Sequence, residues 1–454
     1  MSHGASLDIE AFIDQSRFSP FQWLLLLLCF LVIFMDGYDM AAIAYVAPSL
    51  LDEWGVQKAE LGPAMSAALF GLAFGSLLSG PLADRVGRKP AVIYSVLLFG
   101  VFSLATAWST SIGSLTLLRF ITGLGLGAAM PNSITLLSEY CPSKRRTMIV
   151  SAMLCGFPLG AAVGGLLAGY LIPSFGWRSV LVVGGVVPIL LCVALPWLLP
   201  ESVRYMVLKR YPSARIRAVL QRIKKEGTER AEHFVIAEKI ADGHSAIRAI
   251  LTSPHRTVTG LLWLSCFMSM LVFYMIVSWM PLLLKEAGLS VLQFSHISAL
   301  FPLGGGVGSI VIGWVMDRRE PNKVLALTYL AAGVLAYGVG LAVGNVTHTL
   351  LLGSLVFFMG FASGGGQSAL ASLSASYYPT SCRATGVGSM YGVGRFGAIF
   401  GVLAGAELLR YQYPAAAIFS LLLIPAWLVC LALMLKYFSG RRRELLLARL
   451  PDKQ

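Results

Sequence analysis

The sequence predicts an all-α membrane protein whose twelve transmembrane helices form two six-helix bundles. Of its 454 residues, 57% are hydrophobic and only 13% are charged, and the mean hydropathy is +0.75. A soluble chain of this composition would lack the polar residues needed to cover its core. In addition, short charged motifs recur in the second half of the chain at a nearly constant offset.

The apolar residues form runs long enough to cross a bilayer, which takes a helix of about 20 residues. Residues 1–20 are polar and lack the apolar core and cleavage site of a signal peptide, so we expect the first helix to be retained. The twelve runs begin near Phe21, Glu60, Pro90, Ser114, Thr147, Trp177, Arg256, Ser290, Lys323, His348, Thr385 and Tyr413.

The net charge of +13 is distributed unevenly along the chain. If the N-terminus lies inside, only four of the 35 Lys and Arg residues fall in outer loops and two fall within helices, and the others fall on the cytoplasmic side. This asymmetry follows the positive-inside rule and predicts that both termini are cytoplasmic. The charge is not gathered with aromatic residues on a soluble module, so we expect the lipid bilayer and not nucleic acid as a partner. The four outer residues are Lys58, Arg178, Lys285 and Arg410.

The pattern predicts an N-terminal six-helix bundle (1–199), a cytoplasmic linker (200–255), and a C-terminal six-helix bundle with a cytoplasmic tail (256–454). An apolar stripe at helical spacing lies among basic residues of the linker and predicts an amphipathic helix on the inner membrane face. The stripe consists of Ile216, Val219, Leu220 and Ile223.

The two bundles repeat each other. "GPLADRVGRK" follows the second helix and "GWVMDRREPNK" follows the eighth, which aligns Asp84 with Asp317 at an offset of 233. "EYCPSKRRT" and "SYYPTSCRA" align Arg146 with Arg383 at an offset of 237. A repeat of six helices returns the chain to its starting side, so both copies have the same orientation.

Two carboxylates, Asp36 and Asp39, lie inside the apolar run "FLVIFMDGYDMAAIAYVAP". An Asp at the centre of a membrane helix costs about 2.5–3.5 kcal/mol on insertion scales. At a spacing of three residues they share one helix face. A carboxylate that opens to each side of the membrane in turn can load a proton outside and release it inside. The alternative is that the pair only ties this helix to an arginine, and Gly37 between them permits a close helix approach or a bend.

Two arginines inside membrane helices are the candidate partners. Arg119 lies roughly 10 Å and Asp39 roughly 13 Å from the outer ends of their helices, at 1.5 Å per residue, which makes them a candidate pair. Arg395 lies roughly 15 Å from the inner end of its helix, and its equivalent in the first half is Pro158. A planar guanidinium suits a carboxylate substrate, and an internal salt bridge is the alternative.

No cofactor or metal is expected. The seven Cys residues are scattered singly, and the six His residues include no pair at a spacing of four, which suits neither a disulfide framework nor zinc. A membrane enzyme would need a nucleophile–base or metal cluster, which we do not find. A membrane sensor would need a signalling domain in the linker, which shows no strand alternation.

Several motifs carry a resemblance to a known family. "GPLADRVGRK" resembles the signature of the major facilitator superfamily, and "DGYD", "LRFITGLGLGAAMPN", "LLSEY", "LPESVRY" and "RATGVGSMYGVGRFGAI" resemble its aromatic acid:proton symporters. Those are the 4-hydroxybenzoate and protocatechuate uptake carriers of bacteria, and the likeness runs from about residue 18 to 440. The resemblance implies the major facilitator fold and a proton-coupled importer of a small aromatic carboxylate in a bacterial inner membrane, working by alternating access. We expect a monomer.

A proton-coupled importer of an aromatic acid needs polar residues inside its helices, and the sequence offers candidates. Proton coupling would involve Asp36, Asp39 and Arg119. A benzoate needs an arginine for its carboxylate, apolar walls for its ring and a hydrogen-bond partner for a ring hydroxyl. The candidates for these are Arg395, Gln367, Ser363, Tyr274, Ser278 and Trp279.

The loop motifs are expected to form gates on the cytoplasmic side. The resemblance suggests that Asp84 faces the positive N-terminal end of the eleventh helix, near Ala384–Thr385, when the inside is shut. Basic residues of the loop can also anchor anionic lipid. The candidate gate residues are Asp84, Arg85, Arg88, Glu139, Asp317 and Arg383.

Two alternatives within the superfamily stay open. "PESVRY" also resembles the sugar-porter and organic-ion branch, so a sugar or another organic anion is a possible substrate. Efflux antiporters carry a fifth-helix motif in which a proline stands where "GFPLGAAVGG" has Ala161, which disfavours antiport.

Overall fold

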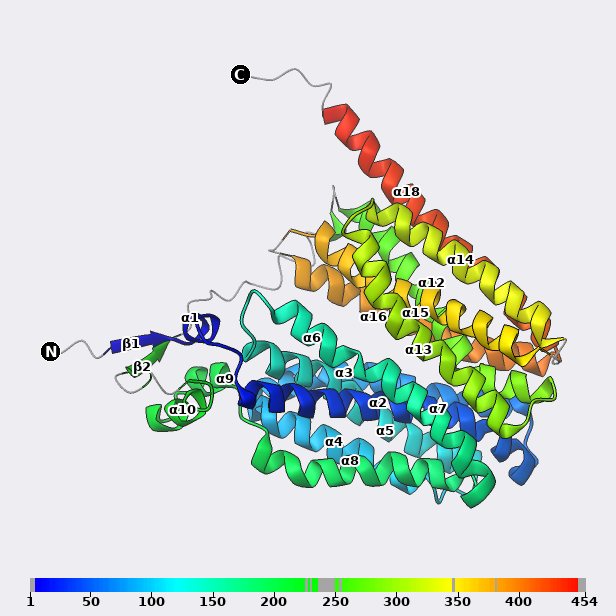
Figure 1. Ribbon diagram of the computed structural model, residues 1–454, viewed down its shortest axis with the longest axis horizontal. Coiled ribbons are helices and arrows are strands. Elements are labelled where there is room, and N and C mark those ends of the chain that lie inside the picture. The colour runs from blue at the N-terminus through cyan, green and yellow to red at the C-terminus, as the bar shows by residue number, and fades with distance from the viewer. Residues whose placement is uncertain are drawn as a thin grey trace. The chain divides into compact units, whose positions relative to one another are not determined.

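The computed structural model describes residues 5–224, 228, 231–235, 250–252, 255–344, 348–379 and 382–447. Within this part of the chain, twelve helices are long and apolar enough to cross a membrane, which confirms the predicted all-α architecture (Figure 1). The spans of the first half are α2 (Pro20–Trp54), α3 (Leu61–Val86) after the 3₁₀ helix η1 (Lys58–Glu60), α4 (Arg88–Thr106), α5 (Ile112–Glu139), α6 (Arg146–Leu154) with α7 (Gly156–Phe175), and α8 (Arg178–Leu198). Those of the second half are α12 (Arg256–Glu286), α13 (Val291–Met316), α14 (Pro321–Val343), α15 (Thr349–Tyr377), α16 (Arg383–Arg410), and α17 (Ala415–Leu421) with α18 (Leu423–Leu447).

Two spans are interrupted, which the apolar runs did not predict. The fifth span breaks at Cys155, between α6 and α7, and the twelfth breaks at Leu422, between α17 and α18. In each case a proline, Pro158 or Pro425, lies four residues after the last residue of the first helix. A proline has no N–H to donate to that residue's carbonyl, so the helical ladder loses a bond at the break.

The chain forms two compact units, which do not coincide with its two halves. Unit 1 consists of Met1–Ala42, Ala67–Ala161 and Arg178–Ile240, and unit 2 of Ile43–Ser66, Ala162–Trp177 and Ala241–Gln454. The end of α2, the start of α3 and most of α7 therefore belong to unit 2. The predicted domain boundaries at residues 199 and 256 stay a prediction.

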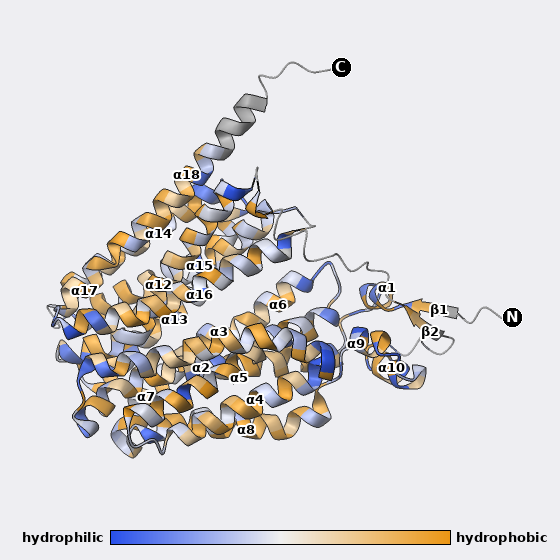
Figure 2. Ribbon diagram, turned by 180° about the vertical axis from the view of Figure 1, so that it is seen from behind, coloured by the Kyte–Doolittle hydropathy of each residue, from blue (hydrophilic) through white to orange (hydrophobic). Residues whose placement is uncertain are grey.

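Close helix packing holds each unit together. In unit 1, α4 packs on α5 and α8, and in unit 2, α12 packs on α16 and α13 on α15. Gly37 shows why small residues are needed: a Cβ there would lie 2.0 Å from the carbonyl oxygen of Phe157 on α7. In lipid, where burial gives helices no drive to associate, such close contact is what joins them. The long helices are mostly hydrophobic and their polar segments lie mainly at the ends (Figure 2).

A small group of elements lies beside the start of α2 in unit 1 (Figure 1). The strand β1 (Ala5–Asp8) pairs in parallel with β2 (Ala231–Val235), next to α1 (Ile9–Asp14), α9 (Val203–Leu208) and α10 (Ser213–Leu220). The linker thus contains a strand, although its sequence shows no alternation.

The apolar stripe of the linker differs from its prediction. Ile216 and Leu220 of α10, and Ile223 just after this helix, are buried against the chain itself, so protein contacts cover these residues. Most of the linker beyond residue 224 lies outside the described residues.

Candidate functional site

The two acidic residues of α2 are fully enclosed in unit 1. Asp36 is 1% exposed and Asp39 is 0% exposed. Both sit in the middle of a helix that crosses the membrane by length and composition. Burial of this kind is costly for a carboxylate unless a partner compensates its charge.

Asp39 has its partner on α5. The Nη1 of Arg119 lies 2.8 Å from Oδ2 of Asp39, and the arginine is also 0% exposed. The pairing inferred from the similar depths of the two residues is therefore present. The Nε and Nη2 groups of Arg119 are buried with no hydrogen-bond partner among the described residues. Asp39 has a further partner, Ser103 on α4, which the sequence did not single out. The hydroxyl of Ser103 donates to Oδ1 of Asp39.

The residues predicted to bind substrate all lie in unit 2. Arg395 lies on α16, and Ser363 and Gln367 lie one turn apart on α15. The hydroxyl of Ser363 is buried with no hydrogen-bond partner in the described part of the chain.

The helix α12 contributes the aromatic members. Tyr274 packs edge-on against Phe273 at 5.4 Å between ring centroids, and Ser278 lies one turn further along the same helix. Trp279 is 1% exposed and donates its indole N–H to the carbonyl of Val402 at 2.9 Å. This bond ties α12 to α16, so the polar group of Trp279 is already in use.

The predicted gate residues of unit 1 form a network where α3 ends. Asp84 pairs with Nη2 of Arg88 at 2.8 Å, and the Nε of Arg88 lies 3.9 Å from Glu139. Arg85 is exposed, and its carbonyl accepts the hydroxyl of Tyr205 at 2.8 Å.

Glu201, which belongs to the "LPESVRY" motif, closes this network. The helix α4 starts at Arg88, directly after Gly87, whose φ of +105° favours glycine and which has no side chain to cap the first amides of the helix. Oε1 of Glu201 accepts the backbone N–H of Arg88 at 2.9 Å and of Lys89 at 3.2 Å. A carboxylate at the positive N-terminus of a helix is stabilising.

The second copy of the loop motif is built differently. Asp317 is exposed at the end of α13, and Arg318 stacks on Trp314 at 3.8 Å. Arg383 is exposed at the start of α16, where its Nε donates to the carbonyl of Tyr378 at 3.3 Å. No ion pair between Asp317 and a basic residue is recorded within the described residues.

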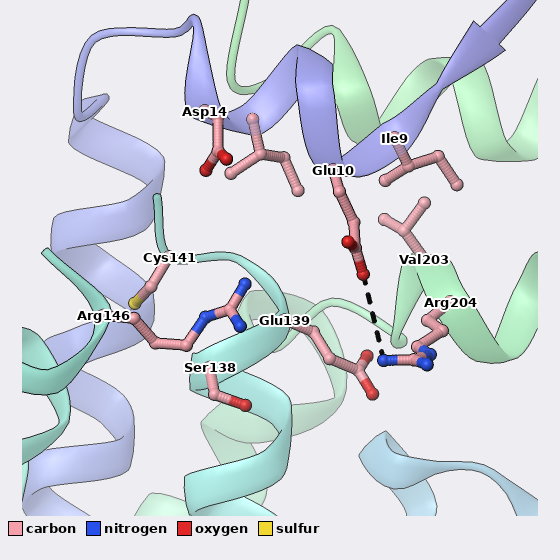
Figure 3. A pocket seen from close by; sticks show the side chains of 10 residues that line it. Ile9, Glu10, Asp14, Ser138, Glu139, Cys141, Arg146, Val203 and Arg204 are labelled. Atoms are coloured by element: carbon pink, nitrogen blue, oxygen red, sulfur yellow. Dashed lines mark ion pairs between the residues drawn. The ribbon is translucent and has the colours of Figure 1, made fainter. Parts of the chain in front are cut away.

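An open pocket with an empty volume of about 520 Å³ lies between α1, α9 and the end of α5 (Figure 3). Glu10 and Arg204 face each other across it at 3.9 Å. Asp14 accepts the backbone N–H of Ser143 at 2.6 Å, which lowers the pKa of that carboxyl below its usual range. Burial raises the pKa of the Cys141 thiol, which also lines the pocket, to about 12. These contacts dock α1 on the end of α5.

Ion pairs at the far end of α2, within unit 2, were also missed. Asp52 pairs with Lys285, whose Nζ also donates to the carbonyl of Pro48 at 3.2 Å, and Lys58 pairs with Glu286. The sequence did mark the positions of these ion pairs, because "PSLLDEWG" and "PLLLKEAG" are a further copy of the repeat at an offset of 233. Both copies end in a glycine with positive φ, +62° and +94°.

Among the described residues, no group of three or more His, Cys, Asp or Glu could hold a metal ion. The comparison with known proteins agrees with a membrane carrier. Residues 29–402 and 262–448 match the Major Facilitator Superfamily. The chain belongs to this superfamily of transporters. As a member of it, the protein is a transporter and not an enzyme.

The transporter has curated relatives over nearly its whole length. It is 46% identical to the 4-hydroxybenzoate transporter PcaK of Pseudomonas putida, across 96% of this chain and 97% of that one. It is 41% identical to the gallate transporter of Pseudomonas putida, across 95% of each chain. The crystal structure of a D-xylose-proton symporter matches with a TM-score of 0.71 at 18% identity, covering 90% of this chain and 97% of that one, which shows the shared fold.

Proposed function

We propose that this transporter is a symporter that imports a small aromatic carboxylate, such as 4-hydroxybenzoate, together with a proton. The relatives named for 4-hydroxybenzoate and gallate support the substrate class. The observation that carries the coupling is the buried ion pair of Asp39 and Arg119 inside the membrane helices of unit 1.

The pair links charge balance to transport. A charge buried in a membrane protein is stable only when it is compensated. When Asp39 takes a proton, the positive charge of Arg119 is no longer balanced, and a bound substrate anion restores the charge balance of the carrier. Proton and carboxylate then favour each other's binding, and the loaded carrier holds no uncompensated charge. Asp36, on the same face of α2, is the second proton-carrying candidate.

Arg395 is the proposed anchor of the substrate carboxylate. Its guanidinium offers the two parallel N–H donors that match a carboxylate. Tyr274 and Phe273 supply ring surfaces in the same unit, and the unused hydroxyl of Ser363 suits a ring hydroxyl. Gln367 lies one turn from Ser363 on α15, and Ser278 lies one turn from Tyr274 on α12, so each adds a polar group beside a candidate residue. Trp279 contributes packing, because its N–H is bound to Val402.

The charged loop residues are proposed as a gate that forms and breaks during alternating access. Asp84, Arg88 and Glu139 are already networked in unit 1. Asp317 and Arg383 would act in unit 2. Both termini are proposed to be cytoplasmic in a bacterial inner membrane, with the monomer as the working unit. A periplasmic signal from a reporter fused at Gln454 would overturn this topology.

The decisive experiment is uptake by proteoliposomes containing the purified transporter. An inward proton gradient should drive accumulation of 4-hydroxybenzoate, and a protonophore should abolish it. Asp39→Asn should lose accumulation more than exchange of labelled for unlabelled substrate, because exchange need not move a net proton. Asp36→Asn tests the second candidate in the same way, and a variant that still accumulates substrate against a gradient is not altered at the essential proton site. Uptake of xylose but not of aromatic acids would favour the sugar-porter alternative, and extrusion of substrate against an inward proton gradient would favour antiport.

Binding tests the carboxylate anchor without transport. Arg395→Lys keeps the charge but loses the fork geometry. Losing one charge-assisted hydrogen bond is worth about 1.5–3 kcal/mol, or roughly ten- to a hundredfold in affinity. Tryptophan quenching in detergent measures this, with the amide of the same acid as a ligand that should bind poorly and be little affected. Native affinity of Arg395→Ala would move the anchor elsewhere, with Arg119 as the first candidate.

A further inference from the structure

The two oxygens of the Asp39 carboxylate have partners of different chemistry. Oδ2 accepts from the guanidinium of Arg119 at 2.8 Å. Oδ1 accepts from the hydroxyl of Ser103 on α4. All three residues are 0% exposed. Asp39 is therefore held from two helices, with the charged donor on one oxygen and a neutral donor on the other.

Only one of these partners can follow a change in protonation. A guanidinium has donors and no acceptor, whereas a serine hydroxyl can either donate or accept. Once Asp39 binds a proton, its new O–H must find an acceptor, because an unsatisfied buried donor is costly. Arg119 cannot supply one. The neighbouring Tyr38 hydroxyl is directed elsewhere, since it donates to the carbonyl of Val180 at 3.0 Å.

The packing around Ser103 leaves space for its hydroxyl to turn. The residue of α8 that faces it is Gly184, which has no side chain. A Cβ at this position would lie 3.4 Å from the hydroxyl of Ser103 and 3.1 Å from the ring of Tyr38. The glycine thus keeps the hydroxyl free of a neighbouring side chain on that side.

We propose that Ser103 is a positioning residue for proton coupling, which holds Asp39 in both of its protonation states. Toward the carboxylate the hydroxyl donates. When a proton from water adds to Oδ1, the hydroxyl of Ser103 turns, donates to the backbone carbonyl of Phe99 four residues earlier on α4, and accepts from the new O–H, while Oδ2 stays with Arg119. The proton is released from Oδ1 by the reverse path. This inference rests on the proposed function, because it assigns the transported proton to Asp39.

The test compares three variants in proteoliposomes. Ser103→Ala removes the hydroxyl, and Ser103→Thr keeps it. Ser95→Ala is the matched control, because Ser95 is a buried serine of the same helix whose hydroxyl donates to the carbonyl of Ala91 at 2.6 Å. Each variant is assayed for exchange of labelled 4-hydroxybenzoate without a gradient, for accumulation driven by a proton gradient, and for protons taken up per substrate.

Ser103→Ala should retain exchange and lose proton-driven accumulation, with fewer protons per substrate. A hydrogen bond to a charged group is worth about tenfold or more in an equilibrium, so accumulation should fall by about tenfold. Ser103→Thr should restore both accumulation and proton uptake, and Ser95→Ala should behave as the native chain.

Two results would overturn the role of Ser103. The first is native accumulation and proton uptake by Ser103→Ala. The second is an equal fall of exchange and accumulation with an unchanged proton-to-substrate ratio, which would indicate packing alone. Asp39→Asn, assayed in parallel, separates this from failure of the proposed function. If Asp39→Asn still couples proton flux to uptake, the proton site itself is wrong, whatever Ser103 does.

Discussion

The buried ion pair predicts an unequal response to removing its two members. Asp39→Asn leaves the guanidinium of Arg119 without a counter-ion in a site that is 0% exposed. An arginine cannot shed its charge. Arg119→Gln instead leaves a carboxylate that can become neutral by binding a proton and that still has Ser103 as a partner. Asp39→Asn should therefore destabilise the fold more than Arg119→Gln.

The magnitude follows from the geometry. Breaking a fully buried pair with a 2.8 Å contact costs about 3–5 kcal/mol. Unfolding entropies of about 2 cal/mol/K per residue place a chain of 454 residues near 1 kcal/mol/K. Asp39→Asn is then expected to lower Tm by about 3–5 °C. Membrane helices keep part of their structure when denatured in detergent, so their unfolding entropy is smaller and this shift is a lower bound.

The assay is thermal unfolding in detergent, followed by intrinsic tryptophan fluorescence, for both single variants and the double variant. Because the double variant has no buried charge to compensate, its Tm should lie above that of Asp39→Asn alone. A larger loss of Tm in Arg119→Gln than in Asp39→Asn would contradict this prediction. So would two shifts that simply add in the double variant, since additivity means that the residues do not interact.

Three further predictions concern packing, reactivity and surface charge. Gly37→Val should prevent α2 from packing on α7, because a Cβ there would lie 2.0 Å from the Phe157 carbonyl oxygen; the yield of monodisperse protein checks this, and a native yield would contradict it. Since burial raises the pKa of Cys141 to about 12, this thiol should stay protonated at pH 7–9 and resist maleimide until the protein is denatured, as mass spectrometry of the labelled protein would show. Lys285→Asp should lower Tm slightly, because an exposed ion pair is worth about 0.2–1 kcal/mol. Adding Asp52→Lys should recover part of this loss, since the contact of Lys285 with the Pro48 carbonyl stays absent, and a swap that recovers nothing would show that the two charges do not interact.

The sequence predicted the fold well, because each helix that crosses a bilayer needs a run of about 20 mainly apolar residues, and such runs can be located directly from hydropathy. All twelve spans lie where apolar runs were seen. The pairing of Asp39 with Arg119 was also within reach, because very few charges lie inside the spans and depth alone narrows the choice. Rare and costly groups are informative in this way.

Common residue types are not informative in the same way, and the contacts that the sequence did not predict are made by such residues. Ser103 is one serine among many, and only the approach of α4 to α2 reveals its bond to Asp39. Glu201 lies in a quoted motif, yet its role at the start of α4 depends on the positive φ of Gly87. The strand β2 pairs with β1 from more than 200 residues away, and no local pattern announces such a pairing.

Comparing the two copies of the repeat separates residues that both copies need for packing from charged residues that only one copy has. Two copies of one helical unit can share packing residues, as they share the glycines that end α2 and α12. Asp36 and Asp39, however, correspond at an offset of 233 to Ser269 and Val272, so the membrane carboxylates belong to the first copy alone. Arg395 belongs to the second copy alone. A scaffold needs neither charge, and their placement on different copies implies that proton coupling and substrate binding can be impaired separately by mutation.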